Sequence, residues 1–227
     1  LHIYETEKEW QKAIDEANII QRQSGEDQST RIAQLYCELT QQNLYFKNFK
    51  GAAEALEKAL KVDPNNKRAL IIKGKMLKAK GDIDGALATW KQVGQISPVY
   101  GTLVVEQIAS LLLEAGRKEE AVKYLEDLFK DGSTTDEVDT AGILLGKAGN
   151  SKEAITLIQE HLKTQPTLVA FYRLIDLRLA NEPENESLKQ LHGLLKNMLS
   201  KAVRYKCTKC GFATRKFLWR CPGCHQW

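Results

Sequence analysis

The chain has 227 residues and a mass of 25.6 kDa, which is enough for one or two ordinary domains or one short solenoid. Its hydrophobic fraction of 43% and charged fraction of 27% indicate a folded protein rather than a disordered one. The aromatic fraction of 7% and the five prolines argue against a sandwich or barrel of many short strands. No apolar run approaches the roughly 20 residues of a membrane-spanning helix, and no signal peptide is recognisable.

Charge and cysteine content divide the chain near residue 200. Residues 201–227 carry seven basic and no acidic side chains, whereas residues 1–200 carry 26 basic and 29 acidic ones. Four of the five cysteines lie in the last 21 residues, which excludes a disulfide framework spread through the chain. We therefore expect two domains, residues 1–200 and residues 201–227. Because the chain starts at Leu1 with residues typical of the middle of a protein, we expect it to be a fragment of a longer one.

Residues 29–168 repeat with a period of about 34 residues. Asp63-Pro64 and Ser97-Pro98 lie 34 residues apart, and each follows a stretch of helical periodicity. A turn interrupts that periodicity in every copy, at Lys47-Asn48, Gly81, Gly116 and Gly149. Two helices in about 34 residues are typical of the tetratricopeptide repeat. We therefore predict an all-α superhelical solenoid with four complete helical hairpins, at about residues 29–66, 67–100, 101–134 and 135–168.

Further helices are expected on both sides of these hairpins. Around residues 10–17, apolar side chains at helical spacing indicate the second helix of a unit whose first helix is partly missing: Trp10, Ala13, Ile14 and Ala17. After the last hairpin, residues 168–180 and 187–201 predict one more helical pair, which the polar loop 181–185 separates.

The residue types within the copies fit helices that pack closely. Small residues recur where two helices must approach each other: Gly74, Ala52, Ala86, Ala121 and Ala154. Larger side chains are expected to fill the space between hairpins: Tyr36, Leu39, Leu56, Leu70, Trp90, Leu125 and Ile158. His161 is expected in the core, on the inner face of a second helix.

A solenoid of this kind exposes a concave groove that usually binds other proteins. We expect inward positions of the first helices to line it: Gln34, Cys37, Gln41, Arg68, Ile71, Lys75, Glu106 and Ser110. Their mixed character specifies no ligand. Cys37 and Gln41 stand where chaperone-tail binders of this class carry Lys and Asn, which weakens a co-chaperone interpretation. We expect Cys37 to be packed or groove-lining rather than a nucleophile.

The last residues contain the pattern Cys-x2-Cys-x10-Cys-x2-Cys, formed by Cys207, Cys210, Cys221 and Cys224. Each Cys-x2-Cys pair makes a tight turn that directs two thiolates to one metal ion, and four thiolates complete a tetrahedral site with no open position. We therefore predict one structural metal ion, zinc or iron, since both occupy such sites. His225 is a conceivable alternative ligand. A miniature aromatic core is expected around the site: Tyr205, Phe212, Phe217, Trp219 and Trp227.

Other interpretations remain as alternatives to a protein-binding scaffold, and one is attraction of the basic tail to an acidic partner or to an anionic membrane surface. The basic tail with interleaved aromatics is typical of nucleic-acid binding, although so small a domain needs its aromatics inside, so nucleic acid is the less favoured partner. A metal held by four thiolates also raises a redox role of the rubredoxin type. Nothing indicates an enzyme, because the sequence has no Gly-rich phosphate loop, no His-Glu-x-x-His and no Gly-x-Ser-x-Gly.

The chain resembles the bacterial lipopolysaccharide assembly protein B family. The tail segments 206–212 (KCTKCGF) and 218–222 (LWRCP) carry the resemblance most specifically, and it extends through 35–39 (LYCEL) to 9–15 (EWQKAID). The resemblance implies cytoplasmic repeats followed by a rubredoxin-like metal knuckle whose ligands fall on the four tail cysteines. It also implies an N-terminal membrane-spanning helix, absent here, that anchors the protein in the inner membrane.

By this resemblance the protein is not an enzyme but an adaptor that restrains lipopolysaccharide synthesis. Members promote destruction of the lipid A pathway's committed deacetylase by a membrane-bound ATP-dependent zinc protease. The implied partners are therefore that protease, the deacetylase and other lipopolysaccharide assembly proteins. True rubredoxins have a much longer separation between their cysteine pairs, which argues against electron transfer.

Overall fold

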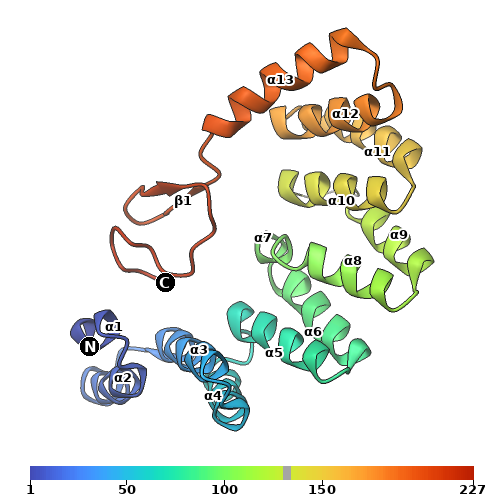
Figure 1. The fold of residues 1–227 in the computed structure, drawn as a ribbon. Coiled ribbons are helices and arrows are strands. Elements are labelled where there is room, and N and C mark those ends of the chain that lie inside the picture. The colour runs from blue at the N-terminus through green and yellow to red at the C-terminus, as the bar shows by residue number, and fades with distance from the viewer. Residues whose placement is uncertain (130–133) are drawn as a thin grey trace. The chain divides into compact units, whose positions relative to one another are not determined.

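The computed structural model describes residues 1–129 and 134–227, which form two compact units (Figure 1). The first unit contains residues 1–97 together with Trp227, and the second contains residues 98–226. Helices make up most of the described chain, and two short strands follow them near the C-terminus. The predicted all-α fold with a small C-terminal metal-binding segment is thereby confirmed.

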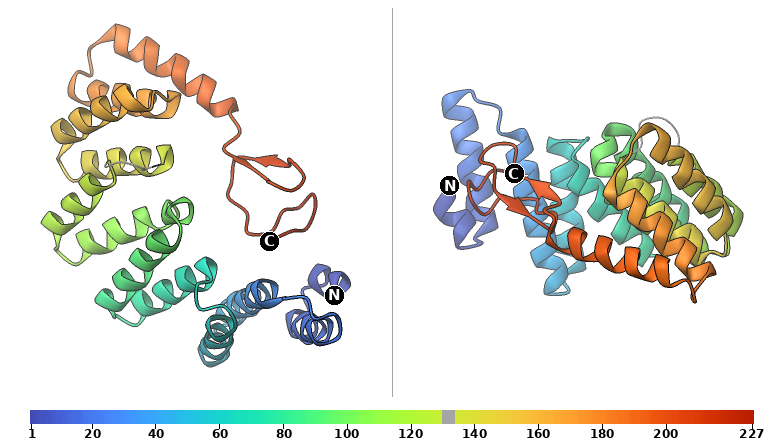
Figure 2. Two further views of the ribbon diagram at one scale, coloured as in Figure 1. Left: turned by 180° about the vertical axis from the view of Figure 1, so that it is seen from behind. Right: turned by 90° about the horizontal axis from the view of Figure 1, so that it is seen from above.

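The first unit consists of two helical hairpins preceded by two helices. Its elements are α1 (His2–Thr6), α2 (Trp10–Ser24), α3 (Ser29–Tyr45), α4 (Phe49–Val62), α5 (Lys67–Ala79) and α6 (Ile83–Ile96). Helix α3 packs on α4, and α5 packs on α6, as the views in Figure 2 also show. These two hairpins begin and end within a few residues of the predicted limits, and α2 is the predicted helix around residues 10–17.

The second unit contains the remaining helices and the strands. Its elements are α7 (Pro98–Gly101), α8 (Val105–Glu114), α9 (Lys118–Asp127), α10 (Thr135–Lys147), α11 (Ser151–Thr164), α12 (Leu168–Asn181), α13 (Glu186–Lys201), β1 (Tyr205–Lys206) and β2 (Ala213–Thr214). The strands are antiparallel, with Tyr205 opposite Thr214. The pairs α8–α9, α10–α11 and α12–α13 match the predicted hairpins, although the end of the third predicted copy lies at residues 130–133, outside the described part.

Local sequence signals set the turns between paired helices. Gly81, Gly116 and Gly149 adopt φ values of 82°, 74° and 88°, the left-handed conformation that glycine takes without strain. Lys47 holds the same conformation, with φ of 58°, in the turn between α3 and α4. The next residue caps the following helix there, because the Asn48 side chain accepts a hydrogen bond from Gly51 N–H.

Small residues allow the close helix packing that the sequence predicts. The four alanines of the repeat pattern are fully buried: Ala52, Ala86, Ala121 and Ala154. At Gly74 in α5 an added Cβ would lie 2.2 Å from Trp90 Nε1, so only glycine leaves room for the indole of α6. That indole is 1% exposed and donates a hydrogen bond to the Ile71 carbonyl oxygen, 3.2 Å away. The core of each hairpin therefore depends on side-chain size at fixed positions.

Candidate metal centre

The two cysteine pairs lie in two turns with the same backbone design. Gly211 and His225, each directly after the second cysteine of a pair, have φ values of 79° and 59°. The N–H of Gly211 donates to the Cys207 carbonyl (3.0 Å), and the N–H of His225 donates to the Cys221 carbonyl (2.9 Å). His225 thus occupies the position that glycine holds in the first turn, and its backbone conformation closes the second turn.

The four sulfur atoms gather at distances that suit one metal ion. Cys207 Sγ lies 3.7 Å from Cys224 Sγ, and Cys210 Sγ lies 3.6 Å from Cys221 Sγ. All four ligand atoms lie within 4.8 Å of one another. A tetrahedral zinc ion with bonds of about 2.3 Å requires sulfurs about 3.8 Å apart. The cysteines therefore form a site that fits a single metal ion coordinated by four thiolates.

Backbone amides favour the thiolate form at one of the four cysteines, Cys207. The N–H groups of Cys210 and Lys209 are directed at the Cys207 sulfur and lower the pKa of that thiol to about 6. The pair of strands β1 and β2 joins the two ends of the first turn, and Cys207 N–H donates to the Phe212 carbonyl at 2.8 Å. Since four thiolates leave no open coordination position, the arrangement suits a structural role rather than metal-centred catalysis.

The aromatic residues of the segment pack only partly as the sequence predicts. Phe217 contacts Tyr205 and Trp219 edge to face, with centroids 5.7 and 4.9 Å apart. Phe212, by contrast, is 40% exposed, and Trp227 is grouped with the first unit, so the prediction was wrong for these two residues. A segment of so few residues offers too little surface to bury five large rings.

Tyr100 of α7 joins this aromatic cluster in their place. Its ring stacks on Trp219 with centroids 5.7 Å apart and an angle of 5° between planes, and it meets Phe217 edge to face at 6.1 Å. Sequence reasoning missed this contact because Tyr100 lies more than 100 residues before its partners. The only local signal was an aromatic residue just after Ser97-Pro98, where the helical pattern stops.

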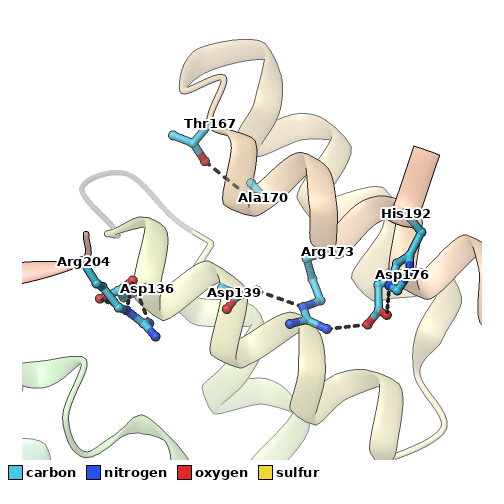
Figure 3. Close-up of polar contacts among 8 residues, drawn as sticks. All are labelled: Asp136, Asp139, Thr167, Ala170, Arg173, Asp176, His192 and Arg204. Atoms are coloured by element: carbon cyan, nitrogen blue, oxygen red, sulfur yellow. Dashed lines mark hydrogen bonds and ion pairs between the residues drawn. The ribbon is translucent and has the colours of Figure 1, made fainter. Parts of the chain in front are cut away.

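An ion pair makes a second connection between the segment and the helices. Arg204, between α13 and β1, places a guanidinium nitrogen 2.8 Å from a carboxylate oxygen of Asp136 in α10 (Figure 3). The hydrogen bond to Asp136 raises the pKa of Arg204. The metal-binding segment is therefore held to the second unit by aromatic stacking at α7 and by this pair at α10.

A polar network fixes α13, the helix that leads into the segment. Arg173 of α12 donates to Asp139 of α10 at 2.9 Å and pairs with Asp176 of its own helix (Figure 3). Asp176 also binds His192 Nε2 of α13 at 3.0 Å, and the His192 ring stacks on Tyr172 at 4.9 Å. The network joins three helices and reaches α13 at His192, so it fixes the first half of this helix within the second unit.

Most of the predicted groove residues do not line an open surface. Gln34, Arg68 and Ile71 are buried, so the prediction was wrong for them, and Cys37 is also buried, which agrees with a packed thiol and not with a groove-lining one. Ser110 is half-buried, and Gln41, Lys75 and Glu106 are exposed. Arg68 of α5 instead binds groups of the preceding first helix, including Gln34 at 3.4 Å and Glu38 at 3.0 Å. These polar residues connect successive hairpins.

Two buried residues outside the cysteine cluster, Cys37 and His161, are packed in the core as the sequence predicts. Cys37 is fully buried, and desolvation raises the pKa of its thiol to about 12, so it is a packed thiol and not a nucleophile. His161 is buried in α11, and burial lowers its pKa.

The repeats also form surface clefts away from the predicted groove residues. A cleft of about 510 Å³ lies between α4 and α5, with Leu56, Leu60 and Met76 among its lining residues and Lys61 and Lys73 beside them. In the second unit, a cleft of about 800 Å³ lies between α9 and α11. Neither includes a predicted groove residue, so second helices contribute more to these surfaces than the sequence suggested.

Hairpins repeated at a 34-residue period and followed by a four-thiol cluster define a tetratricopeptide protein with a C-terminal metal-binding segment. Residues 17–184 match the model of the tetratricopeptide repeat-like domain, and the chain belongs to this family. Residues 205–227 match the rubredoxin metal binding domain.

Among curated proteins the chain is similar to lipopolysaccharide assembly protein B. It is 30% identical to that of Escherichia coli strain K12 over 232 residues, covering 100% of this chain and 59% of the relative. It is 28% identical to that of Haemophilus influenzae over 238 residues, covering 100% of this chain and 58% of the relative. The resemblance found in the sequence is confirmed, and the chain spans about three fifths of the length of these relatives.

Solved structures support the fold alone. BtubC from P. vanneervenii has a TM-score of 0.54 at 11% identity, covering 92% of this chain and 97% of that one. The C-terminal part of a tetratricopeptide repeat-containing protein from Cytophaga hutchinsonii has a TM-score of 0.53 at 13% identity, covering 88% of this chain and 78% of that one. Within residues 1–129 and 134–227, no helix combines the length and apolar character needed to cross a membrane.

Proposed function

We propose that this chain is part of a non-catalytic adaptor that regulates lipopolysaccharide synthesis at the cytoplasmic face of the bacterial inner membrane. The observation that carries the proposal is similarity along the whole chain to lipopolysaccharide assembly protein B, including the segment with the four clustered cysteines. Tetratricopeptide repeats commonly bind other proteins, which fits an adaptor. The adaptor brings the committed deacetylase of the lipid A pathway to a membrane-bound ATP-dependent protease, which degrades it.

In this proposal the metal-binding segment is residues 201–227, and Cys207, Cys210, Cys221 and Cys224 hold one structural zinc or iron ion. When bound, the ion supplies folding free energy, on the order of 10–16 kcal/mol for zinc in comparably small domains. The protein's own residues then do the positioning: Tyr100 and Asp136 hold the segment against the helices. The segment thus presents a fixed surface beside the repeats to a partner.

The metal assignment is tested by metal analysis of purified variants. Cys210→Ser is expected to lose the single bound ion, because three thiolates and a hydroxyl bind it far more weakly. His225→Gly is the matched control: it relieves the positive φ of a non-glycine residue and leaves the sulfur cluster intact, so one ion per chain should remain. Loss of metal from His225→Gly with retention in Cys210→Ser would contradict the four-cysteine assignment. Elemental analysis of the wild type distinguishes zinc from iron.

The regulatory role is tested in a bacterium that lacks its own relative and expresses this chain behind a membrane-spanning helix. With the wild-type chain we expect the deacetylase half-life to shorten, and with Cys221→Ser plus Cys224→Ser to lengthen again. Cys37→Ala removes a thiol outside the cluster and is the control. The level of the adaptor is followed in parallel, and the effect should vanish when the membrane protease is absent. A deacetylase half-life that is the same with and without the chain, although the chain accumulates in the cells, would overturn the proposal.

A further inference from the structure

The turn between α3 and α4 exposes three aromatic side chains. Tyr45 ends α3, Phe46 follows it, and Phe49 begins α4; they are 82%, 70% and 65% exposed. Tyr45 and Phe46 contact each other edge to face, with centroids 5.2 Å apart, and neither of the two core clusters to which α3 contributes, as described for residues 1–97, includes any of the three. Exposed apolar groups gathered in this way mark an interaction surface.

The fold itself does not require aromatic residues at this turn. The same three positions in the turns around residues 81, 116 and 149 hold no aromatic residue: Ala79, Lys80 and Ile83; Glu114, Ala115 and Lys118; Lys147, Ala148 and Ser151. Those three turns place glycine at the left-handed position, whereas Lys47 here and Lys8 before α2 both adopt φ of 58°. Trp10 follows Lys8 as Phe49 follows Lys47, but Trp10 is buried, so it is the exposure of its aromatic residues that distinguishes the turn between α3 and α4.

Two lysines lie beside these aromatics, and the first acidic residue along α4 is Glu54, one helical turn after Lys50. Lys47 and Lys50 are exposed and, in the part of the chain that the structure describes, form no ion pair. No acidic residue occurs between Glu38 and Glu54. Aromatic rings flanked by lysines are the combination that favours the boundary between anionic headgroups and acyl chains, because rings enter the interface while ammonium groups meet phosphate.

The turn is rigid enough to present these side chains together. Asn48 accepts a hydrogen bond from Gly51 N–H at 3.1 Å, and its own amide donates to Asn43 Oδ1 at 2.8 Å. A Cβ at Gly51 would lie 2.4 Å from the Asn48 side chain, so the start of α4 packs tightly on the turn. Fixed geometry lowers the entropy lost on binding a surface.

We propose that the turn Tyr45–Lys50 binds the surface of an anionic lipid bilayer. The aromatic rings insert at headgroup level, and the two lysines make the binding selective for anionic lipid. This inference rests on the exposed turn and not on the proposed regulation of lipopolysaccharide synthesis, and its test needs neither the protease nor the deacetylase.

The test is sedimentation of the metal-loaded 227-residue chain with vesicles of phosphatidylcholine, with or without about 30% phosphatidylglycerol. Tyr45→Ser/Phe46→Ser/Phe49→Ser is expected to lower the partition coefficient on anionic vesicles at least about tenfold, since three rings leave the interface. Lys47→Gly/Lys50→Gln should lower it by roughly fivefold per lysine on anionic vesicles and leave the binding to neutral ones unchanged. Lys47→Gly introduces the residue that stands at the left-handed position in the turns at 81, 116 and 149.

Leu194→Ser/Met198→Ser is the matched control, because it removes two exposed apolar side chains of α13 that are 64% and 55% exposed. Its partition coefficient should equal that of the wild type. Circular dichroism and thermal unfolding confirm that each variant is folded, as expected for exposed positions. The basic residues 201–227 are the same in all variants and contribute equally to vesicle binding. Differences in partition coefficient between the variants therefore measure the contribution of the turn.

A second readout uses Phe46→Trp, whose added fluorescence should be quenched by brominated lipid beyond the quenching of the wild-type tryptophans. The proposal is overturned if the aromatic variant binds anionic vesicles as well as the wild type does, or if the added tryptophan is not quenched. It is also overturned if the wild type binds no vesicle but self-associates through this turn, seen as a loss of oligomer in the aromatic variant.

Discussion

Tyr100→Ala is expected to release the metal-binding segment from the helices without unfolding either. Tyr100 makes two ring contacts, with Trp219 at 5.7 Å and Phe217 at 6.1 Å. Each such pair contributes about 0.5–1.5 kcal/mol beyond the burial of area, so the substitution should weaken the attachment by roughly 1–3 kcal/mol. The Arg204–Asp136 pair is 48% and 28% exposed at its side chains and contributes about 0–1 kcal/mol. Stacking at Tyr100 is therefore the dominant contact of the two.

The assay is the rate of metal transfer from the loaded protein to an excess of a chromogenic chelator. If the ion leaves mainly from the detached segment, the rate follows the detached population and should rise about 5–150-fold in Tyr100→Ala. Tyr100→Phe keeps the ring contacts with Trp219 and Phe217, so it is the control and should release metal at a rate near that of the wild type. Asp136→Asn should raise the rate no more than about fivefold.

Equal release rates in Tyr100→Ala and Tyr100→Phe would show that stacking does not hold the segment, and the reasoning would fail. A larger effect from Asp136→Asn than from Tyr100→Ala would reverse the order of the two contacts. Helicity measured by circular dichroism must stay unchanged in every variant, because α7 is short and Tyr100 lies within it.

Three further outcomes follow from buried positions and from the metal. Gly74→Ala should lower the free energy of unfolding in urea by about 1–5 kcal/mol, because the added methyl group overpacks against Trp90 and breaks the hydrogen bond of its indole, and a gain in helix propensity offsets only part of this cost. Gly193→Ala is the control: an added Cβ there would meet nothing within 4 Å, so this variant should be more stable by about 1 kcal/mol. Burial lowers the pKa of His161, so the unfolded chain binds a proton at a higher pH than the folded chain does. The wild type should therefore lose stability as the pH falls below about 6.5, and His161→Leu should not lose this contribution. The measurement is the difference in melting temperature between the two proteins, which should change as the pH is lowered through about 6.5. Chelation of the metal should make residues 202–227 sensitive to trypsin and leave helicity nearly unchanged, because that segment contains no helix.

The repeat architecture could be predicted because its signals are local. A left-handed glycine, a capping side chain and a proline or aspartate at a helix end each act within a few residues, so Gly81 was enough to place the turn between α5 and α6, and the structure adds Asp82 as the cap of α6. The cysteine cluster could be predicted for the same reason, since each pair is closed by its own turn. Neither prediction required knowledge of distant contacts.

Contacts between successive repeats follow the repeat period and not a local signal. Arg68 binds Gln34, and Arg173 binds Asp139; in both cases the partners are 34 residues apart, which is one repeat. Stacked hairpins place equivalent positions of neighbouring first helices side by side, so polar residues one period apart are candidate pairs. Four of the predicted groove residues are buried in such positions or beside them.

Residues that depart from the repeat are therefore more informative about function than residues that follow it. Arg68 and Arg173 connect neighbouring hairpins, because each binds a carboxylate of the preceding first helix, Glu38 and Asp139 respectively. Tyr100 lies in α7, a short helix that has no counterpart in the other hairpins, and it holds the metal-binding segment. Tyr45 and Phe46 occupy a turn where three equivalent turns carry no aromatic residue. The fold gains nothing from these exceptions, so each is best explained by a contact that the repeats alone do not make: the metal-binding segment for Tyr100, and the lipid surface that we propose for the turn.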